Sequence, residues 1–222
     1  MVPVVTRSTT PRRAASTATR RKAATGHKTT ARTRTRPATA DAIALLKSDH
    51  REVEKLFKSF EKAGDKAFRT KRKLVDEMIR ALSVHAAIEE QVLYPAARRE
   101  VPQTSDEVLE SLEEHHVAKW LLSELEGLDP SAERFAAKVT VLIENVRHHV
   151  REEEHDLFPT LRANISRKVL LELGGRLQDA KRIAPTRPHP RSPDEPPGNQ
   201  IVGTVAGVVD RARSAVKAAR QS

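Results

Sequence analysis

Two histidine–glutamate pairs with the same spacing are the residues of this sequence best suited to chemistry. His85 lies four residues before Glu89, and His149 lies four residues before Glu153. Residues four apart lie on one face of a helix, so each pair can present an imidazole and a carboxylate together. Burying a carboxylate costs free energy unless a positive charge compensates it. The two pairs therefore indicate a metal site inside a helical bundle.

The chain repeats a helical hairpin, and the repeat adds one lone histidine to each pair. A shift of 65 residues carries His50 onto His115, and a shift of 64 residues carries His85 onto His149 with the glutamates that follow. One histidine on an apolar seam is commonly a packing residue. Four histidines at matching positions of a duplicated hairpin favour metal ligation instead.

The donor types restrict the metal. The chain contains no cysteine, which excludes disulfides, zinc–thiolate sites and thiol catalysis. Imidazole and carboxylate ligands suit iron, manganese or zinc. Two bridging carboxylates favour a site with two metal ions, and we expect iron, with manganese or zinc as the alternatives.

Helical periodicity supplies the elements that must position these residues. Apolar residues recur at spacings of three and four, which is the pattern of helices that bury one face. Pro95 predicts the end of the second helix or a kink, and Gly174-Gly175 weakens the fifth. We predict an all-α, up-down-up-down four-helix bundle, a duplicated hairpin, followed by a short helix, with helices over about 41–62, 66–94, 104–126, 131–158 and 160–180.

Charge divides the chain into three parts. Residues 1–40 contain ten Lys and Arg and no Asp or Glu, and nothing in them could bury a core, so a disordered basic arm is expected. Residues 41–180 form the predicted acidic bundle domain with its following helix. Residues 181–222 are predicted to be a proline-rich linker and a short basic helix over 201–219. Docking, oligomerisation, contact with a membrane surface and a frayed tail are the open interpretations of this helix.

The basic arm has three competing interpretations. It could bind nucleic acid nonspecifically, it could be a transit peptide, or it could be a solvated tail without a specific partner. The sequence shows no run of apolar residues long enough to cross a membrane and no apolar signal-peptide core. We therefore expect a cytoplasmic protein.

Four segments resemble the hemerythrin (HHE cation-binding) family: DHREVEKLFKSFE, HAAIEEQVLYP, EEHHVAKWLLSELE and HHVREEEHDLFP. The resemblance covers about residues 41–160. It implies a bundle around an oxo- or hydroxo-bridged di-iron centre. It also implies that Glu89 and Glu153 bridge the two irons and that the terminal ligands are His50, His85, His115 and His149.

The sequence departs from the oxygen-carrying members of the family in two places. Those carriers have a second histidine where this chain has Lys119, and they use His-x4-Asp where this chain offers Glu153 or Glu154; the internal repeat favours Glu153. A water, Glu54 or an exogenous ligand could take the vacant position. The departures disfavour reversible oxygen storage.

Three functional hypotheses follow. The first is a di-iron protein that binds or senses oxygen, nitric oxide or peroxide, or handles iron. The second is an enzyme that decomposes peroxide at the same centre. The third is a nucleic-acid-associated role of the basic tails. Of the remaining polar residues, His116 and His148 are expected to point away from the site, and Glu90 and Glu154 to lie beside it without bridging.

Overall fold

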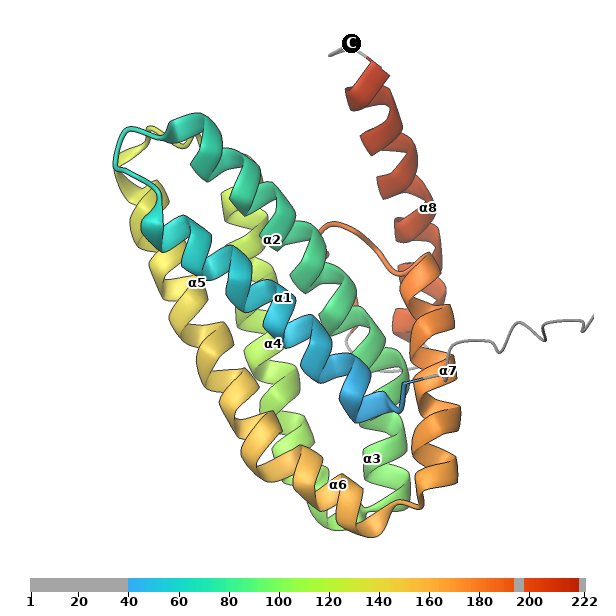
Figure 1. Ribbon diagram of the computed structural model, residues 1–222. Helices are drawn as coiled ribbons and strands as arrows, with labels where there is room; N and C mark the ends of the chain where they lie inside the picture. The colour runs from blue at the N-terminus through green and yellow to red at the C-terminus, as the bar shows by residue number, and fades with distance from the viewer. Residues whose placement is uncertain (1–39, 194–197, 220–222) are drawn as a thin grey trace, which may run out of the picture. The chain divides into compact units, whose positions relative to one another are not determined.

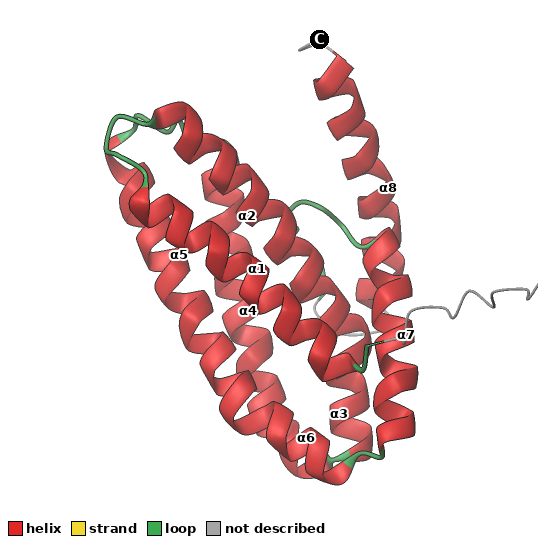
Figure 2. Ribbon diagram, in the orientation of Figure 1, coloured by secondary structure: helices red, strands yellow, loops and turns green. Residues whose placement is uncertain are grey.

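The computed structural model describes residues 40–193 and 198–219, and all regular structure within them is helical (Figures 1 and 2). The expected basic arm over 1–40 lies almost wholly outside these residues. The elements in chain order are α1 (Ala42–Lys62), α2 (Phe68–Ile88), η1 (Glu89–Leu93), α3 (Tyr94–Glu100), η2 (Pro102–Thr104), α4 (Ser105–Glu126), α5 (Glu133–Glu152), η3 (Glu153–Leu157), α6 (Phe158–Asn164), α7 (Arg167–Ile183) and α8 (Gly198–Ala219).

Helices α1, α2, α4 and α5 form the predicted four-helix bundle (Figure 1). Short loops join α1 to α2 and α4 to α5, so each pair is an antiparallel hairpin. The first helix begins where the sequence supplies a cap, because the Ala44 backbone N–H donates to the Asp41 carboxylate at 2.8 Å. The bundle and its duplicated hairpin are therefore confirmed.

The second and fourth helices of the bundle run further than predicted. Each passes through one π-helical turn, η1 or η3, in which the Tyr94 N–H donates to the Glu89 carbonyl and the Phe158 N–H to the Glu153 carbonyl. A proline in a regular helix clashes with the carbonyl four residues earlier, and the wider turn just before Pro95 relieves this conflict. The predicted ends at 94 and 158 were wrong for this reason.

The fifth helix is shifted from its predicted range of 160–180. Residues 160–164 continue α6, and α7 begins after Ser166, whose hydroxyl accepts from the Val169 N–H at 3.3 Å. The helix is not interrupted at Gly174. A Cβ atom at Gly174 would lie 2.2 Å from the Ala40 carbonyl oxygen, so glycine is what lets α7 pack against the start of α1.

Helix α8 occupies the region predicted as a basic helix, and it contacts α7 and η1. Residues 184–193 follow α7 and have no regular secondary structure. Among the described residues, no helix is both long enough and apolar enough to cross a membrane.

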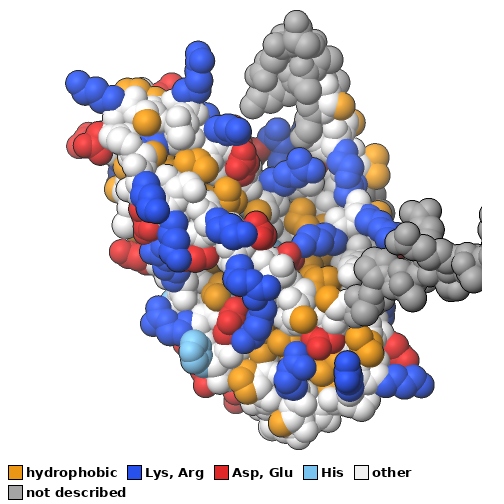
Figure 3. Space-filling model, in the orientation of Figure 1, with side chains coloured by type: hydrophobic (Ala, Val, Ile, Leu, Met, Phe, Trp, Pro, Cys, Tyr) orange, Lys and Arg blue, Asp and Glu red, His pale blue; other side chains and the backbone are white. Residues whose placement is uncertain are grey.

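The core is divided into two apolar clusters. One gathers around Phe57 and Phe135 near the α1–α2 loop, and the other around Tyr94 and Phe158 near α7. Buried polar residues lie between the clusters. The face shown in Figure 3 carries Lys, Arg, Asp and Glu side chains interspersed over the bundle, as expected for a solvated surface.

Candidate metal centre

The bundle brings all six predicted ligands together in its buried polar layer. None of these residues is more than 5% exposed. Each helix of the bundle contributes one histidine, and each glutamate is the first residue of a π-helical turn. A π turn re-aims the side chains at its start, which is one reason such turns recur at functional sites. The six residues are His50, His85, Glu89, His115, His149 and Glu153.

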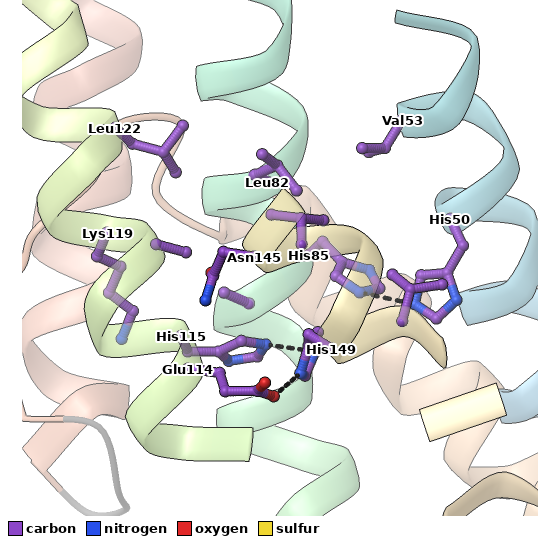
Figure 4. Close-up of a pocket in the computed structure, with 14 residues that line it drawn as sticks. His50, Val53, Leu82, His85, Glu114, His115, Lys119, Leu122, Asn145 and His149 are labelled. Carbon is purple, nitrogen blue, oxygen red and sulfur yellow. Dashed lines mark hydrogen bonds and ion pairs between the residues drawn. The ribbon is translucent and has the colours of Figure 1, made fainter. Parts of the chain in front are cut away.

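The imidazole rings meet in two pairs (Figure 4). The Nε2 atoms of His50 and His85 are 3.1 Å apart, and so are those of His115 and His149. Each pair joins the lone histidine of one helix to the His-x3-Glu histidine of the helix beside it. The internal repeat of the sequence is thus reproduced as two similar half-sites.

The two glutamates lie between the half-sites. One Glu89 oxygen, Oε2, lies 3.1 Å from His85 Nε2 and 3.5 Å from His115 Nε2. The Oε2 of Glu153 lies 3.3 Å from His50 Nε2 and 3.6 Å from His149 Nε2. Each carboxylate therefore faces one ring of each half-site.

A carboxylate stands behind the outer nitrogen of each lone histidine. The Nδ1 of His50 lies 2.8 Å from Glu154, and the Nδ1 of His115 lies 3.0 Å from Glu90. An ionised carboxylate only accepts hydrogen bonds, so these Nδ1 atoms carry the protons. The Nε2 atoms then have free lone pairs that point into the layer. Glu90 and Glu154 lie beside the site, as the sequence predicted.

The other two histidines are backed by acids that the sequence interpretation missed. Glu114 Oε2 lies 2.8 Å from His149 Nδ1, and Asp49 Oδ2 lies 3.9 Å from His85 Nδ1. Each acid immediately precedes the lone histidine of the neighbouring helix. The repeat contained this signal, because Asp49 falls on Glu114 under the same shift that carries His50 onto His115.

The inward-facing atoms form a set of donors that could hold a cation. Both oxygens of Glu89 and one of Glu153 are buried without a hydrogen-bond partner among the described residues. Around them lie the four Nε2 atoms, whose lone pairs would repel one another at these distances. Buried acceptors without donors are costly, so this donor set fits positive charge placed between the rings and the carboxylates.

Protons alone would not neutralise the buried charges evenly, because the pKa values of the histidines in this layer are shifted in opposite directions. Burial would lower the pKa of His85, but the nearby Glu89 carboxylate raises it to about 10. Burial together with the neighbouring His149 holds the pKa of His115 well below its usual range. Burial acts to raise the pKa of Glu153, yet the imidazoles of His149 and His50 lower it to about 2.

Tyr94 adds a hydrogen-bond donor to one half-site. Its hydroxyl donates to Glu153 Oε1 at 2.9 Å and lies 3.4 Å from His115 Nε2. Burial and the Glu153 carboxylate raise the pKa of Tyr94 well above its usual value, so the phenol stays protonated. Its repeat partner is Phe158, which stacks on His50 with ring centroids 5.8 Å apart.

Glu54 is not at the site, which corrects its proposed role at the vacant position. Its carboxylate accepts two hydrogen bonds from the Arg147 guanidinium, both at 3.0 Å, and a third of its side chain is exposed. Lys119, its repeat partner, points inward instead. The Lys119 ammonium is buried and lies 2.7 Å from Glu90 Oε1.

The neighbouring histidines point away from the layer, as predicted. Half of the His148 side chain is exposed, and its Nε2 lies 3.1 Å from Glu152. His116 accepts a hydrogen bond from the Trp120 indole at 3.0 Å. These two residues therefore serve as matched controls for their ligand neighbours.

A small cavity borders the four rings on the side of the α1–α2 loop (Figure 4). Its volume is about 30 Å³, which accommodates a water or a molecule of similar size. Hydrocarbon from Leu82, Leu122 and Val146 lines much of it, and Lys119 and Asn145 bring polar atoms. We call it the inner cavity.

Comparison with known families agrees with this geometry. The family described as Hemerythrin HHE cation binding domain matches residues 41–161, more than half of the chain. The chain belongs to the hemerythrin HHE cation-binding family. All six converging residues lie inside the matched range, so the buried His/Glu layer falls within a domain of cation-binding, hemerythrin type.

Individual relatives extend this result. The chain is 25% identical over 166 residues to an uncharacterised hemerythrin-like protein of Schizosaccharomyces pombe, covering 74% of this chain and 81% of that protein. It is 31% identical over 122 residues to a DNA nickase of Nostoc, covering 55% of this chain and 34% of the nickase. The chain therefore spans about a third of the nickase.

A solved structure supports the fold. The crystal structure of a hemerythrin HHE cation binding domain-containing protein from Mycobacterium kansasii superimposes with a TM-score of 0.55 at 23% identity. The superposition covers 64% of this chain and 86% of that one. At this identity the likeness concerns the helical bundle.

Proposed function

We propose that the chain holds two irons between its half-sites and binds a small ligand there. One observation carries the proposal: four Nε2 lone pairs and three unpartnered carboxylate oxygens converge in a layer that is closed to water. His50 and His85 would hold one ion, His115 and His149 the other, and Glu89 and Glu153 would bridge both.

The spacing within each half-site fits a single ion. Two imidazole nitrogens bound at about 2.1 Å and at right angles to each other would lie roughly 3 Å apart. The observed Nε2–Nε2 separation is 3.1 Å in both pairs. Two clusters of potential ligands that share Glu89 also fit two ions better than one.

Imidazole with bridging carboxylate suits iron, and a pair of irons supplies oxygen, nitric oxide or peroxide with a redox-active binding position. The protein's own contribution is to orient the ligands and to exclude bulk water. The acids behind the rings fix the imidazole tautomers, and the hydrocarbon of the inner cavity limits the ligand to a few atoms. Sensing of such a ligand, or handling of iron, is the role we propose.

Metal analysis with an optical spectrum tests the proposal. Full-length protein loaded anaerobically with ferrous iron should contain about two irons per chain and develop near-ultraviolet absorption on oxidation. His149→Ala should lose at least one iron, whereas its neighbour variant His148→Ala should keep both. Wild-type protein that stays free of iron after loading would contradict the proposal.

Peroxide decomposition is the second candidate, and Lys119 favours it. Where oxygen-carrying members of the family have a ligand histidine, this chain places a buried ammonium at the edge of the inner cavity. Peroxide consumption, measured by oxygen release, should then depend on the iron. Turnover that is the same in wild type and in the His85→Ala/His149→Ala variant would rule this activity out.

A nucleic-acid role rests on a separate observation. Residues 1–40 carry ten Lys and Arg and no acids, and one relative is a DNA nickase. Binding of duplex DNA through this arm should weaken steeply with salt. Deleting residues 1–40 should abolish it, and equal affinity with and without the arm would exclude the arm as the contact.

A further inference from the structure

Lys119 lies between two small cavities. The inner cavity borders the four histidine rings. A second cavity of about 40 Å³, the outer cavity, lies between η1 and residues 185–193 together with the first half of α8. Of the described residues that line them, Lys119 is common to both. The Lys119 side chain therefore stands on the direct path from one cavity to the other.

A buried ion pair holds Lys119 in this position. Its ammonium lies 2.7 Å and 2.9 Å from the two oxygens of Glu90, which is itself only 4% exposed. The same carboxylate contacts His115 Nδ1 at 3.0 Å. Figure 4 shows Lys119 reaching from α4 toward the ring of His115. The position of the ammonium is therefore coupled to a candidate ligand.

A cover forms one wall of the outer cavity. We use this name for residues 185–193, which lie over η1 and α4. The fully buried Asp210 of α8 fixes the cover, because its Oδ2 accepts from the Thr186 and Arg187 backbone N–H groups, both at 3.1 Å. The same oxygen lies 3.2 Å from His189 Nε2. One carboxylate thus holds the cover at Thr186, Arg187 and His189.

The cover is also attached to α4 beside Lys119 and two turns beyond it. Arg187 pairs with Glu126, near the end of that helix. The Arg191 guanidinium lies 5.8 Å from the ring centroid of Trp120. Movement of the cover would therefore uncover the helix face from which Lys119 extends.

We infer that Lys119 is the gate of the access route to the metal centre and that it selects for small anions. The inference rests on the proposed function, since it presupposes a metal with an exchangeable position. A small anion that enters the inner cavity loses water beside Leu82, Leu122 and Val146. When the Lys119 ammonium turns from Glu90 toward the inner cavity, its charge offsets this cost for an anion and does little for a neutral diatomic molecule.

The selectivity is tested with azide as the anionic probe and nitric oxide as the neutral one. Both are titrated optically into iron-loaded, full-length protein. The Lys119→Met/Glu90→Gln variant removes both charges together, and Glu90→Gln alone is the control that keeps the ammonium. We expect the double variant to bind azide about ten- to a hundredfold more weakly than the control. Its affinity for nitric oxide should stay within about threefold.

The route is tested by loosening the cover. Asp210→Ala removes the carboxylate that holds residues 186–189, and Asp179→Ala removes an exposed acid of α7 as the control. A barrier on the access route slows association and dissociation by the same factor, so it leaves the dissociation constant unchanged. Azide association and dissociation should therefore both accelerate by about tenfold in Asp210→Ala with an unchanged dissociation constant. Azide association and dissociation rates equal to those of wild type would show that azide does not reach the site by this route.

The two proposals fail in different ways. Wild-type protein that takes up no iron contradicts the proposed function whatever Lys119 does. Iron-loaded wild type that binds no azide, or a double variant that binds azide as tightly as the Glu90→Gln control, overturns the gate alone. If the double variant does not load iron, Lys119→Gln takes its place, because it keeps a hydrogen-bonding group for Glu90, and the same loss of azide affinity is required.

Discussion

At the scale of single residues, the acids behind the histidines organise the site. Glu114 and Asp49 each sit on one helix and contact the ring of the next. A metal-ligating imidazole keeps its orientation and basicity when a carboxylate accepts from its outer N–H. Glu114 therefore braces His149 from another helix, and Glu154 does the same for His50. Asp49 lies 3.9 Å from His85 Nδ1, beyond hydrogen-bond distance, and acts on that ring through its charge.

Replacing one of these acids should weaken metal binding without removing a ligand. Glu114→Gln should lower the iron affinity about 10- to 100-fold, because the amide polarises His149 less than the carboxylate does. Competition with a chelator measures this. The exposed neighbour variant Glu113→Gln should match wild type, and equal affinities in all three proteins would contradict the role of Glu114.

The sequence predicted which buried residues converge better than it predicted the acids that stand behind them. Spacing and repeat were enough to find the six converging residues, because residues four apart on one helix must share a face. Asp49 was missed because it lies beside His50 in sequence but contacts His85 on another helix. Glu54 was misplaced because the Arg147 guanidinium draws its carboxylate out of the layer.

At the scale of elements, two adjacent glycines in α7 differ in their surroundings, so one tests tertiary packing and the other tests helix propensity. Gly174 meets the Ala40 carbonyl, whereas nothing lies within 4 Å of a Cβ at Gly175. The sequence showed only a weak point in a helix, since the close approach arises from a tertiary contact.

These neighbours give opposite predictions. Gly174→Ala should destabilise the protein by about 1–3 kcal/mol, because α7 must move away from the start of α1. Gly175→Ala should stabilise it by up to about 1 kcal/mol, because alanine favours a helix interior. Calorimetric unfolding compares the two. Destabilisation of equal size at both positions would refute the close packing of Gly174.

An ion pair between α1 and α5 should depend on pH. Arg147 donates to Glu61 at 2.7 Å, and this hydrogen bond outweighs slight burial to lower the pKa of Glu61 below 4.5. A lowered pKa stabilises the fold above the unfolded value and loses that stabilisation as the pH falls through the folded value.

The corresponding variant is Glu61→Gln. It should cost less than about 1 kcal/mol at pH 7, since the pair is well exposed, and the difference from wild type should shrink toward pH 3.5. Thermal unfolding across this range gives the comparison, with exposed Glu144→Gln as the control. A difference that grows on acidification would be the wrong sign.

At the scale of the whole molecule, a polar layer separates two apolar clusters. Periodicity was sufficient to predict the bundle. It could not predict where the chain after Ile183 lies, because the cover is held by backbone N–H groups and one acid of α8 rather than by an apolar seam.

The polar layer should make stability depend on metal. Each iron at 100 times its dissociation constant should add about 2.7 kcal/mol, which corresponds to roughly 5–10 °C per ion in melting temperature for a chain of this size. His115→Ala should lose most of this increase and His116→Ala should keep it. Scanning calorimetry with and without iron measures the shift, and identical shifts in both variants would contradict the ligand assignment.

The duplicated hairpin can be regarded as a homodimer fused into one chain, with Glu89 and Glu153 as the matching residues of its two halves. In a true homodimer every substitution appears twice. Fusion lets the halves diverge: the first hairpin has Glu54 and Tyr94 where the second has Lys119 and Phe158. Because Lys119 and Tyr94 both lie close to His115, whereas Phe158 stacks on His50, the two sides of the buried layer have become chemically different.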